Sequence, residues 1–253
     1  MKRQHWMWLI LGGLSVSLIG NYLLYQRYRI SYAHVQKVQL DPLSIDQFSA
    51  ESPFDADSSL TRILFFGDSR ASAWPAPSAL PNVQFANRGV GGHTSAQCLG
   101  RFAKHVEGSQ ADILIIQMGI NDLKTIPLFP DQKSAIQETC LRNIQQQLRK
   151  SRQLGMKVVL STIFPVGDIP TARRLVWSAD VDQSVADINQ QLIAWAASDP
   201  GIVILESSQL LAGPDGHVLP DYQRDFLHLN SQGYLRLNTA LTELLSDSLL
   251  FVR

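Results

Sequence analysis

The chain has 253 residues, and its 22 basic and 22 acidic side chains leave a formal net charge of zero. A neutral chain offers no basic surface to hold nucleic acid, so nucleic-acid binding is excluded as the main function. The hydrophobic content of 45% is typical of a globular protein with a sizeable core.

The first 29 residues are much more apolar than the rest. Residues 6–25 contain no charged side chain, and Trp6, Trp8, Tyr22 and Tyr25 lie near the two ends of this stretch. About 20 helical residues reach roughly 30 Å, which is the thickness of the hydrocarbon layer. We expect residues 1–29 to form a membrane anchor with one uncleaved helix over about 6–25. A cleaved signal peptide is the alternative, but no small-x-small cleavage site follows the apolar run.

The basic residues near the apolar stretch leave its orientation almost undecided. Lys2 and Arg3 favour a cytoplasmic N-terminus, whereas Arg27, Arg29 and Lys37 lie on the other flank. We predict a membrane-anchored protein and expect its catalytic domain to lie outside the cytoplasm, although these charges alone do not decide the orientation.

A linker is expected between the anchor and the main domain. Residues 30–59 contain Pro42, Pro53 and an acidic run at 55–59, and no hydrophobic period is sustained over residues 26–59. This composition predicts a stalk or a segment that wraps around the following domain.

From residue 60 onward, strand-like and helix-like stretches alternate. Strands are predicted at 62–66, 82–87, 112–118, 157–163 and 202–206, and helices at 95–106, 131–154, 181–198 and 231–250. The strands are continuous apolar runs, which are typical of a parallel sheet covered by helices on both faces. We therefore predict an α/β fold over residues 60–253, a three-layer α/β/α sandwich with a five-stranded parallel sheet.

Residues suited to catalysis follow the predicted strands or precede the last helix. They are Gly67-Asp68-Ser69, residues 87–94, Gly119-Ile120-Asn121-Asp122 and residues 225–230. Ligand sites in parallel sheets gather at the carboxyl ends of the strands. Together these groups supply a hydroxyl nucleophile, a histidine, an acid to orient it, and donors for an oxyanion, which are the parts of an acyl-transfer site.

The spacing of Asp225 and His228 predicts a direct interaction. Side chains three positions apart in a helical turn lie on the same side, so Asp225 can accept a hydrogen bond from one imidazole nitrogen. The other nitrogen is then free to act as a base toward Ser69.

The chain resembles the SGNH (GDSL) hydrolase family in four segments, FFGDSR, NRGVGGHTS, GINDL and DFLHLNSQGY, and the resemblance covers about residues 60–245. It implies a flavodoxin-like fold in which Ser69 is the nucleophile, His228 the general base, and Asp225 the residue that orients His228. It also implies an oxyanion hole made by the backbone N–H groups of Ser69 and Gly92 and by the side-chain amide of Asn121. Gly89 and Gly91 are rival candidates in the second segment.

Several neighbouring residues are given other expectations. Arg70, where the family often has a smaller or apolar residue, is expected at the surface in a salt bridge, with contact to an anionic or sugar-rich substrate as the alternative. His93 either lines the pocket or is an ordinary loop residue. Asp68 and Asp122 are expected to accept hydrogen bonds from loop backbone. Whether Cys98 and Cys140 pair is left open.

These observations predict a serine esterase that cleaves a carboxylic ester of a small molecule, carbohydrate or lipid through an acyl-enzyme. An O-acyltransferase acting on a sugar would use the same residues. An inactive, membrane-tethered binding domain is a third hypothesis. A nucleotide-binding module is disfavoured, because the glycine-rich segment follows the second strand rather than the first. No metal or other cofactor is expected, because no clustered ligand pattern is present.

Overall fold

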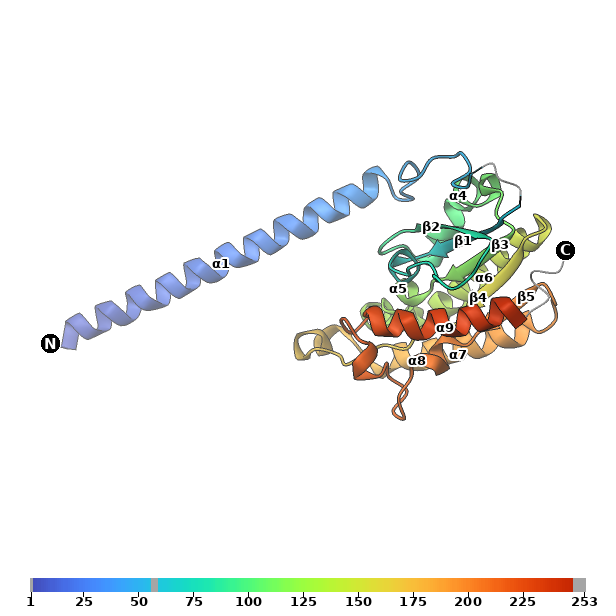
Figure 1. Ribbon diagram of the computed structural model, residues 1–253. Coiled ribbons are helices and arrows are strands. Elements are labelled where there is room, and N and C mark those ends of the chain that lie inside the picture. The colour runs from blue at the N-terminus through green and yellow to red at the C-terminus, as the bar shows by residue number, and fades with distance from the viewer. Residues whose placement is uncertain (1, 56–58, 248–253) are drawn as a thin grey trace. The chain divides into compact units, whose positions relative to one another are not determined.

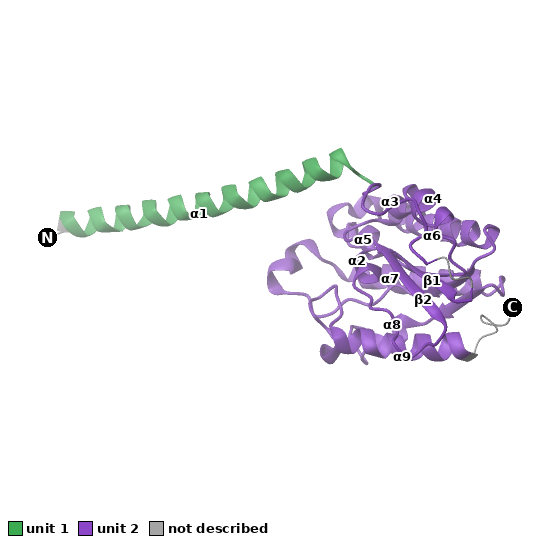
Figure 2. Ribbon diagram, turned by 45° about the horizontal axis from the view of Figure 1, so that its top comes forward, with its two compact units in different colours: residues 1–43 green, residues 44–253 purple. Residues whose placement is uncertain are grey.

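The computed structural model describes residues 2–55 and 59–247 and divides the chain into two compact units, Met1–Leu43 and Ser44–Arg253 (Figure 2). The first unit is essentially one helix, and the second is an α/β domain. The predicted helix over 231–250 and the acidic run at 55–59 each extend partly outside the described residues.

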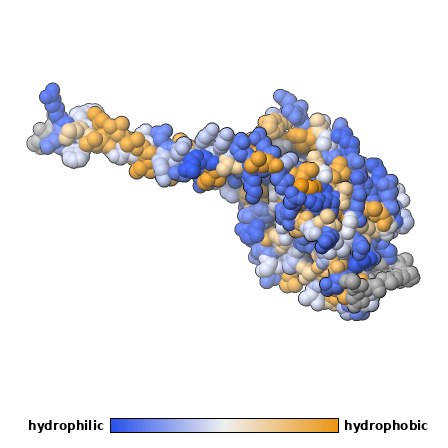
Figure 3. Space-filling model, turned by 90° about the horizontal axis from the view of Figure 1, so that it is seen from above, coloured by the Kyte–Doolittle hydropathy of each residue, from blue (hydrophilic) through white to orange (hydrophobic). Residues whose placement is uncertain are grey.

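The first unit contains α1 (Lys2–Leu40), a helix of 39 residues. It is long and apolar enough to cross a membrane, with a mean hydropathy of 1.6 over its most apolar window, although a signal sequence would meet the same criteria. Its apolar side chains are exposed and gather in the N-terminal part (Figure 3). The helix runs past residue 29 into the predicted linker, because no Gly or Pro interrupts the sequence between Gly20 and Pro42.

The second unit is built on a five-stranded parallel sheet with the order β2-β1-β3-β4-β5 (Figure 1). The strands are β1 (Thr61–Gly67), β2 (Val83–Gly89), β3 (Ile113–Gln117), β4 (Lys157–Ser161) and β5 (Ile202–Leu205). All five predicted strands are confirmed to within two residues at each end. The chain passes from β1 outward to β2 and then crosses to β3 on the other side of β1. This reversal places a topological switch point between β1 and β3, where ligand sites form in such sheets.

Alternating side chains of the strands divide the core into two layers. In β1, Leu64 and Phe66 belong to one apolar cluster, and Ile63 and Phe65 belong to the other. The first cluster contains side chains of α3 (Ser95–Gly100), α4 (Phe102–His105), α6 (Lys133–Gln153) and α7 (Ala179–Ala196). The second contains side chains of α8 (Ser207–Leu211) and α9 (Ser231–Asp247). The predicted three-layer sandwich is therefore confirmed.

Some helices differ from the prediction. The helix expected over 95–106 is divided into α3 and α4 at Gly100 and Arg101, since glycine is a weak helix former. The short helices α2 (Ser69–Ser72), α5 (Ile120–Leu123) and α8 were not expected, because a single turn is too short to show a period. Two of these single turns, α2 and α5, directly follow β1 and β3.

Residues 44–55, which we call the arm, begin the second unit and pack on the rest of its α/β domain. Phe54 lies against the first apolar cluster, and the Phe48 ring contacts the His105 ring edge-on with 5.4 Å between centroids. The arm also makes polar contacts: Asp46 with Lys104, the Glu51 carbonyl with Arg88, and the Ser52 hydroxyl with the Ser109 carbonyl. Residues 44–55 of the predicted stalk or wrapping segment therefore wrap around the domain.

The arm is expected to stabilise the second unit. A chain beginning at Ser59 would lose these contacts and leave the Arg88 guanidinium short of one acceptor, so we expect it to be about 3 kcal/mol less stable than a chain beginning at Ser44. For a domain of this size that difference lowers the Tm by roughly 6 to 12 °C. Thermal unfolding of the two chains checks this, and equal Tm values would show that the arm contributes nothing.

Candidate active site

Ser69 is held in a tight turn between β1 and α2. Gly67, the last residue of β1, has φ +151°, and a Cβ there would lie 1.7 Å from the Gln117 carbonyl oxygen of β3. Only glycine lets the two strand ends approach so closely. Asp68 then caps α2, its Oδ1 accepting a hydrogen bond of 2.8 Å from the Arg70 N–H. This turn places Ser69, half-buried, at the carboxyl end of the sheet.

Ser69, His228 and Asp225 form a continuous hydrogen-bonded chain. The distance from Ser69 Oγ to His228 Nε2 is 3.0 Å, although the two residues are 159 positions apart. His228 Nδ1 lies 2.9 Å from each carboxylate oxygen of Asp225. A proton on Nδ1 is thereby shared with the carboxylate, and Nε2 is left as an acceptor for the Ser69 hydroxyl.

The loop that carries Asp225 and His228 differs from the helical turn that the spacing suggested. Residues 224–227 form a bend outside any helix, and Asp225 Oδ1 accepts hydrogen bonds from the backbone N–H groups of Leu227 and His228 at 2.9 and 3.0 Å. The pairing of Asp225 with His228 was thus predicted, but the loop is a turn held by hydrogen bonds from its backbone to the Asp225 side chain. Burial acts to raise the pKa of Asp225, yet the hydrogen bonds from Leu227 and His228 outweigh it and hold this pKa below its ordinary value. Asp225 is therefore ionised at neutral pH.

Arg70 is fully buried, so its expected surface position is wrong. Its guanidinium donates to the carbonyl oxygens of Leu227, Phe164 and Pro165 at 2.8, 2.8 and 3.3 Å. The Tyr234 hydroxyl in turn donates to the Arg70 carbonyl at 2.8 Å. Burial lowers the pKa of Arg70 to about 10, which still leaves it charged at neutral pH. Arg70, which directly follows Ser69, therefore links the nucleophile turn to the loop that carries His228.

The loop after β2 lies between Ser69 and Asn121. A Cβ on Gly91 would be 3.9 Å from the Ser69 Cβ, whereas one on Gly92, at φ +80°, would meet open space. The side chain of Asn121 is buried, and its Nδ2 donates to the His93 carbonyl at 3.0 Å. Lys124 Nζ donates to Asn121 Oδ1 at 2.5 Å, which fixes the orientation of the amide. The second N–H of Asn121 is available to a ligand.

His93 is buried and belongs to a polar network under the nucleophile turn. Its Nδ1 accepts a hydrogen bond of 3.2 Å from Arg101 Nε, and its Nε2 lies 3.2 Å from the Ser44 hydroxyl of the arm. Arg101 also donates to the Gly67 carbonyl at 2.7 Å and stacks on Phe66. His93 therefore links the arm to Arg101, and Arg101 links His93 to the end of β1.

The other predicted polar residues have structural partners. Asp122 accepts hydrogen bonds from the backbone N–H and the hydroxyl of Ser95 at 2.8 and 2.6 Å, as expected for a residue that orders a loop. Cys98 and Cys140 are buried free thiols, and burial raises the pKa of both. They do not form a disulfide.

Asp68 is expected to make stability depend on pH. It is fully buried, and its Oδ2 has no hydrogen-bond partner among the described residues; burial raises its pKa from 3.8 to about 6. The folded chain then holds this proton more tightly than the unfolded chain. Protonated Asp68 therefore adds to the free energy of unfolding below about pH 4, and this added stability is lost as the pH rises through 6. A rise of this size corresponds to on the order of 3 kcal/mol.

The variant Asp68→Asn isolates this contribution, because it keeps the cap and cannot ionise. Between pH 4 and 7 the free energy of unfolding of the unchanged protein should fall by on the order of 3 kcal/mol relative to the variant. Urea unfolding at several pH values measures both, and parallel curves would contradict the assignment.

The sequence did not reveal the roles of three side chains that organise the site. Arg70 and Arg101 are charged residues inside the core, and Lys124 orients Asn121. Two features of the sequence could have pointed to these arginines. Arg101 lies among apolar residues of the predicted helix 95–106, and Arg70 directly follows Ser69.

Comparison with known proteins shows the family to which the chain belongs. The model of the GDSL-like lipase/acylhydrolase family matches residues 58–236, which is more than half of the chain. The chain belongs to the GDSL-like lipase/acylhydrolase family. Hydrolysis is therefore the reaction class that membership of the GDSL family implies. No curated protein matches the chain.

Solved structures with the same fold include two that are named for this family. A GDSL-like lipase from Bacteroides thetaiotaomicron is 21% identical with a TM-score of 0.60, covering 74% of this chain and 88% of its own. A member of the lipolytic G-D-S-L family from Veillonella parvula is 18% identical with a TM-score of 0.58, covering 74% and 100%. An acetyl xylan esterase is 17% identical with a TM-score of 0.54, covering 73% and 99%. At these identities the likeness shows the GDSL fold alone.

Proposed function

We propose that the protein is a serine esterase that hydrolyses a carboxylic ester through an acyl-enzyme on Ser69. The observation that carries the proposal is the chain of hydrogen bonds from Ser69 Oγ to His228 Nε2, 3.0 Å, and from His228 Nδ1 to Asp225, 2.9 Å. A serine hydroxyl at its ordinary acidity is a weak nucleophile, and an adjacent base oriented by a carboxylate is the usual means of activating it.

In the acylation step, Ser69 Oγ attacks the ester carbonyl while its proton passes to His228 Nε2. The bond between Oγ and the carbonyl carbon forms, and the ionised Asp225 stabilises the imidazolium that results. His228 then gives the proton to the departing alcohol oxygen as the carbon–oxygen bond breaks. Water attacks the acyl-enzyme by the same route, with His228 again as base, and releases the carboxylic acid and free Ser69.

The negative oxygen of the tetrahedral intermediate needs donors beside Ser69. We assign this role to the backbone N–H groups of Ser69 and Gly92 and to the second amide hydrogen of Asn121. The support for Asn121 is that His93 and Lys124 hold its amide in one orientation, so little reorganisation is needed when the charge develops. The support for the loop after β2 is its approach to Ser69 at Gly91.

We also propose that α1 anchors the enzyme in a membrane, with the second unit outside the cytoplasm. The proposal rests on the length of α1 and on its exposed apolar side chains, such as Trp6 and Trp8. After alkaline carbonate extraction of expressing cells, the full chain should stay with the membranes and a chain beginning at Ser44 should not. Release of the full chain would refute the anchor.

The esterase proposal is tested with the full chain in a mild detergent and a series of p-nitrophenyl esters from acetate to octanoate. Release of p-nitrophenol should saturate with substrate and should be abolished by a fluorophosphonate, which reacts with activated serines. Turnover that is not saturable, or that a fluorophosphonate leaves intact, would contradict the proposal.

A further inference from the structure

Lys124, Arg173 and Arg174 are three basic side chains near the candidate active site that make no ion pair among the described residues, although Asp68 and Asp122 raise the pKa of Lys124. In the second unit, basic groups lie 2.6 to 3.7 Å from a carboxylate in six ion pairs, those of Arg62, Lys104, Lys133, Lys150, Arg152 and Arg224, the last with Asp225 of the candidate active site. Within the described residues, Lys124, Arg173 and Arg174 make no such ion pair. Arg142, Arg149 and Arg236 are also without one, but they belong to the long helices α6 and α9.

Lys124 and Arg173 lie beside the groups assigned to catalysis. The Lys124 ammonium donates to the amide of Asn121, and the Arg173 guanidinium lies 5.8 Å from the ring centroid of Phe226, between Asp225 and His228 in sequence. Burial lowers the pKa of Lys124, the negative charges of Asp68 and Asp122 raise it, and the positive charges of Arg70 and Arg173 lower it. A negative group of a substrate at this edge of the site would be attracted to Lys124 and to Arg173.

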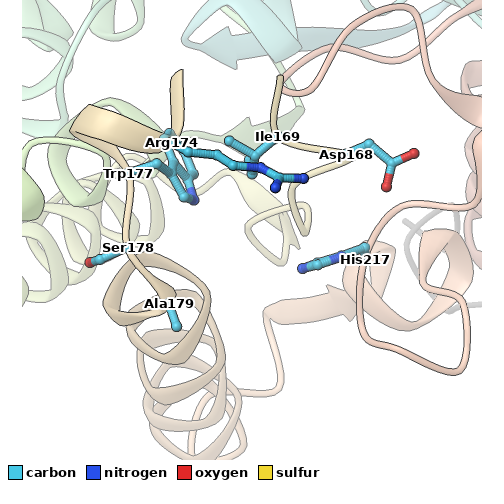
Figure 4. A pocket seen from close by; sticks show the side chains of 7 residues that line it. All are labelled: Asp168, Ile169, Arg174, Trp177, Ser178, Ala179 and His217. Atoms are coloured by element: carbon cyan, nitrogen blue, oxygen red, sulfur yellow. The ribbon is translucent and has the colours of Figure 1, made fainter. Parts of the chain in front are cut away.

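A pocket lies along residues 168–177, which we call the 168–177 loop. Its volume is about 380 Å³, and its lining includes Arg174, Trp177, His217 and the first residues of α7. Figure 4 shows Arg174 and His217 directed toward the same hollow, with Asp168 at its edge. The volume is near the lower end of the range for small-molecule sites, and an aromatic wall with several polar groups suits a polar, ring-shaped ligand.

The pocket is joined to the catalytic loop by direct contacts. The Trp177 ring meets the Phe226 ring edge-on with 5.5 Å between centroids. The backbone N–H of Gly167 donates to the Phe226 carbonyl at 2.9 Å, and that of Asp168 to the Gln223 side chain at 3.2 Å. The wall of the pocket at Trp177 therefore borders the loop that carries His228.

We propose that the alcohol part of the substrate carries a carboxylate or phosphate group, bound by Lys124 and Arg173 at the edge of the active site with Arg174 and the pocket beyond them. This inference rests on the proposed esterase function and specifies its substrate class. The 168–177 loop also exposes Leu175, 92% accessible, which would suit the apolar chains of a lipid with an anionic headgroup. An acidic sugar would supply the same anionic group without such chains.

The test compares two esters of matched size and leaving group. The full chain in detergent is assayed for acetate release from 4-acetoxybutanoate, which is anionic, and from 4-acetoxybutanamide, which is neutral. We expect kcat/KM to be roughly tenfold higher for the anionic ester, and this ratio to fall as salt is raised from 20 to 500 mM. A ratio of one or less, with both esters hydrolysed, would overturn the inference and leave the esterase function standing. Hydrolysis of neither ester, nor of p-nitrophenyl acetate, would instead refute the esterase function.

Two double variants locate the preference. Arg173→Gln with Arg174→Gln should reduce the ratio of the two kcat/KM values toward one. The control, Arg142→Gln with Arg236→Gln, removes two equally exposed charges from α6 and α9 and should leave the ratio as it is. Equal effects of the two pairs would show a general charge effect and contradict a site at the 168–177 loop.

Two further anionic esters distinguish the source of the charge. A methyl glucuronide acetylated on one hydroxyl represents an acidic sugar, and 1-acetylglycerol 3-phosphate represents a lipid headgroup. The higher kcat/KM identifies the source, and a loss of that activity in the Arg173 and Arg174 double variant would attribute it to this site. Failure of both to exceed 4-acetoxybutanamide would count against the proposal.

Discussion

Replacing Ser69 by alanine is expected to lower kcat/KM for short-chain p-nitrophenyl esters by roughly 10⁴-fold or more. The variant keeps His228 and the oxyanion donors but has no oxygen to form the acyl-enzyme, so only general binding and polarisation of the ester remain. Because Ser69 is half-buried at the start of a short helix, loss of its hydroxyl should leave the Tm within about 2 °C. Steady-state kinetics and thermal unfolding measure the two quantities.

Ser72→Ala is the matched control, since Ser72 is the exposed last residue of the same helix. It should retain activity within about twofold. If Ser69→Ala kept activity comparable to Ser72→Ala, the nucleophile would have to be sought elsewhere.

His228→Ala should reduce kcat/KM by roughly 10⁴-fold, and Asp225→Ala by roughly 10²- to 10³-fold. Without His228, nothing within 3.0 Å of Ser69 Oγ accepts its proton among the described contacts. Without Asp225, the imidazole is still present but loses the partner that fixes its tautomer and stabilises its charged form. The loop also loses the acceptor for two backbone N–H groups, so the Tm of Asp225→Ala should fall.

Asp225→Asn separates these two roles. Its amide oxygen can still accept the loop hydrogen bonds, but it carries no charge to stabilise an imidazolium, so stability should be largely restored while activity stays low. Asp221→Ala, at an exposed position in the preceding segment, serves as the control. A larger activity loss in Asp225→Ala than in His228→Ala would contradict the assigned roles.

The sheet and the positions of the chemical groups were predictable because each depends on a local pattern. Continuous apolar runs such as 112–118 have no other stable place than a strand buried on both faces. The residues that follow them must then reach the carboxyl edge of the sheet. This reasoning placed Ser69 and His228 at one edge, although it could not give the distance between them.

The interior of the site was not predictable, because it depends on contacts between distant segments. An arginine after the nucleophile is usually solvated, and nothing local reveals that the carbonyls of Phe164 and Leu227 surround the guanidinium of Arg70. The contacts of the arm were not predictable for the same reason, although the composition of residues 30–59 allowed for a wrapping segment. Its contacts with His93 and Arg88 depend on tertiary packing and not on any period in residues 44–55.

The central claim, that Ser69 carries the acyl group, is tested most directly by trapping the intermediate. The full chain is mixed with p-nitrophenyl butyrate, quenched in acid within the first turnovers, and analysed by intact mass and peptide mapping. The account predicts one added butyryl group on the peptide that contains Ser69, absent from Ser69→Ala and accumulating in His228→Ala only very slowly. A butyryl group on another residue in the unchanged protein, with Ser69 unmodified while hydrolysis proceeds, would contradict it.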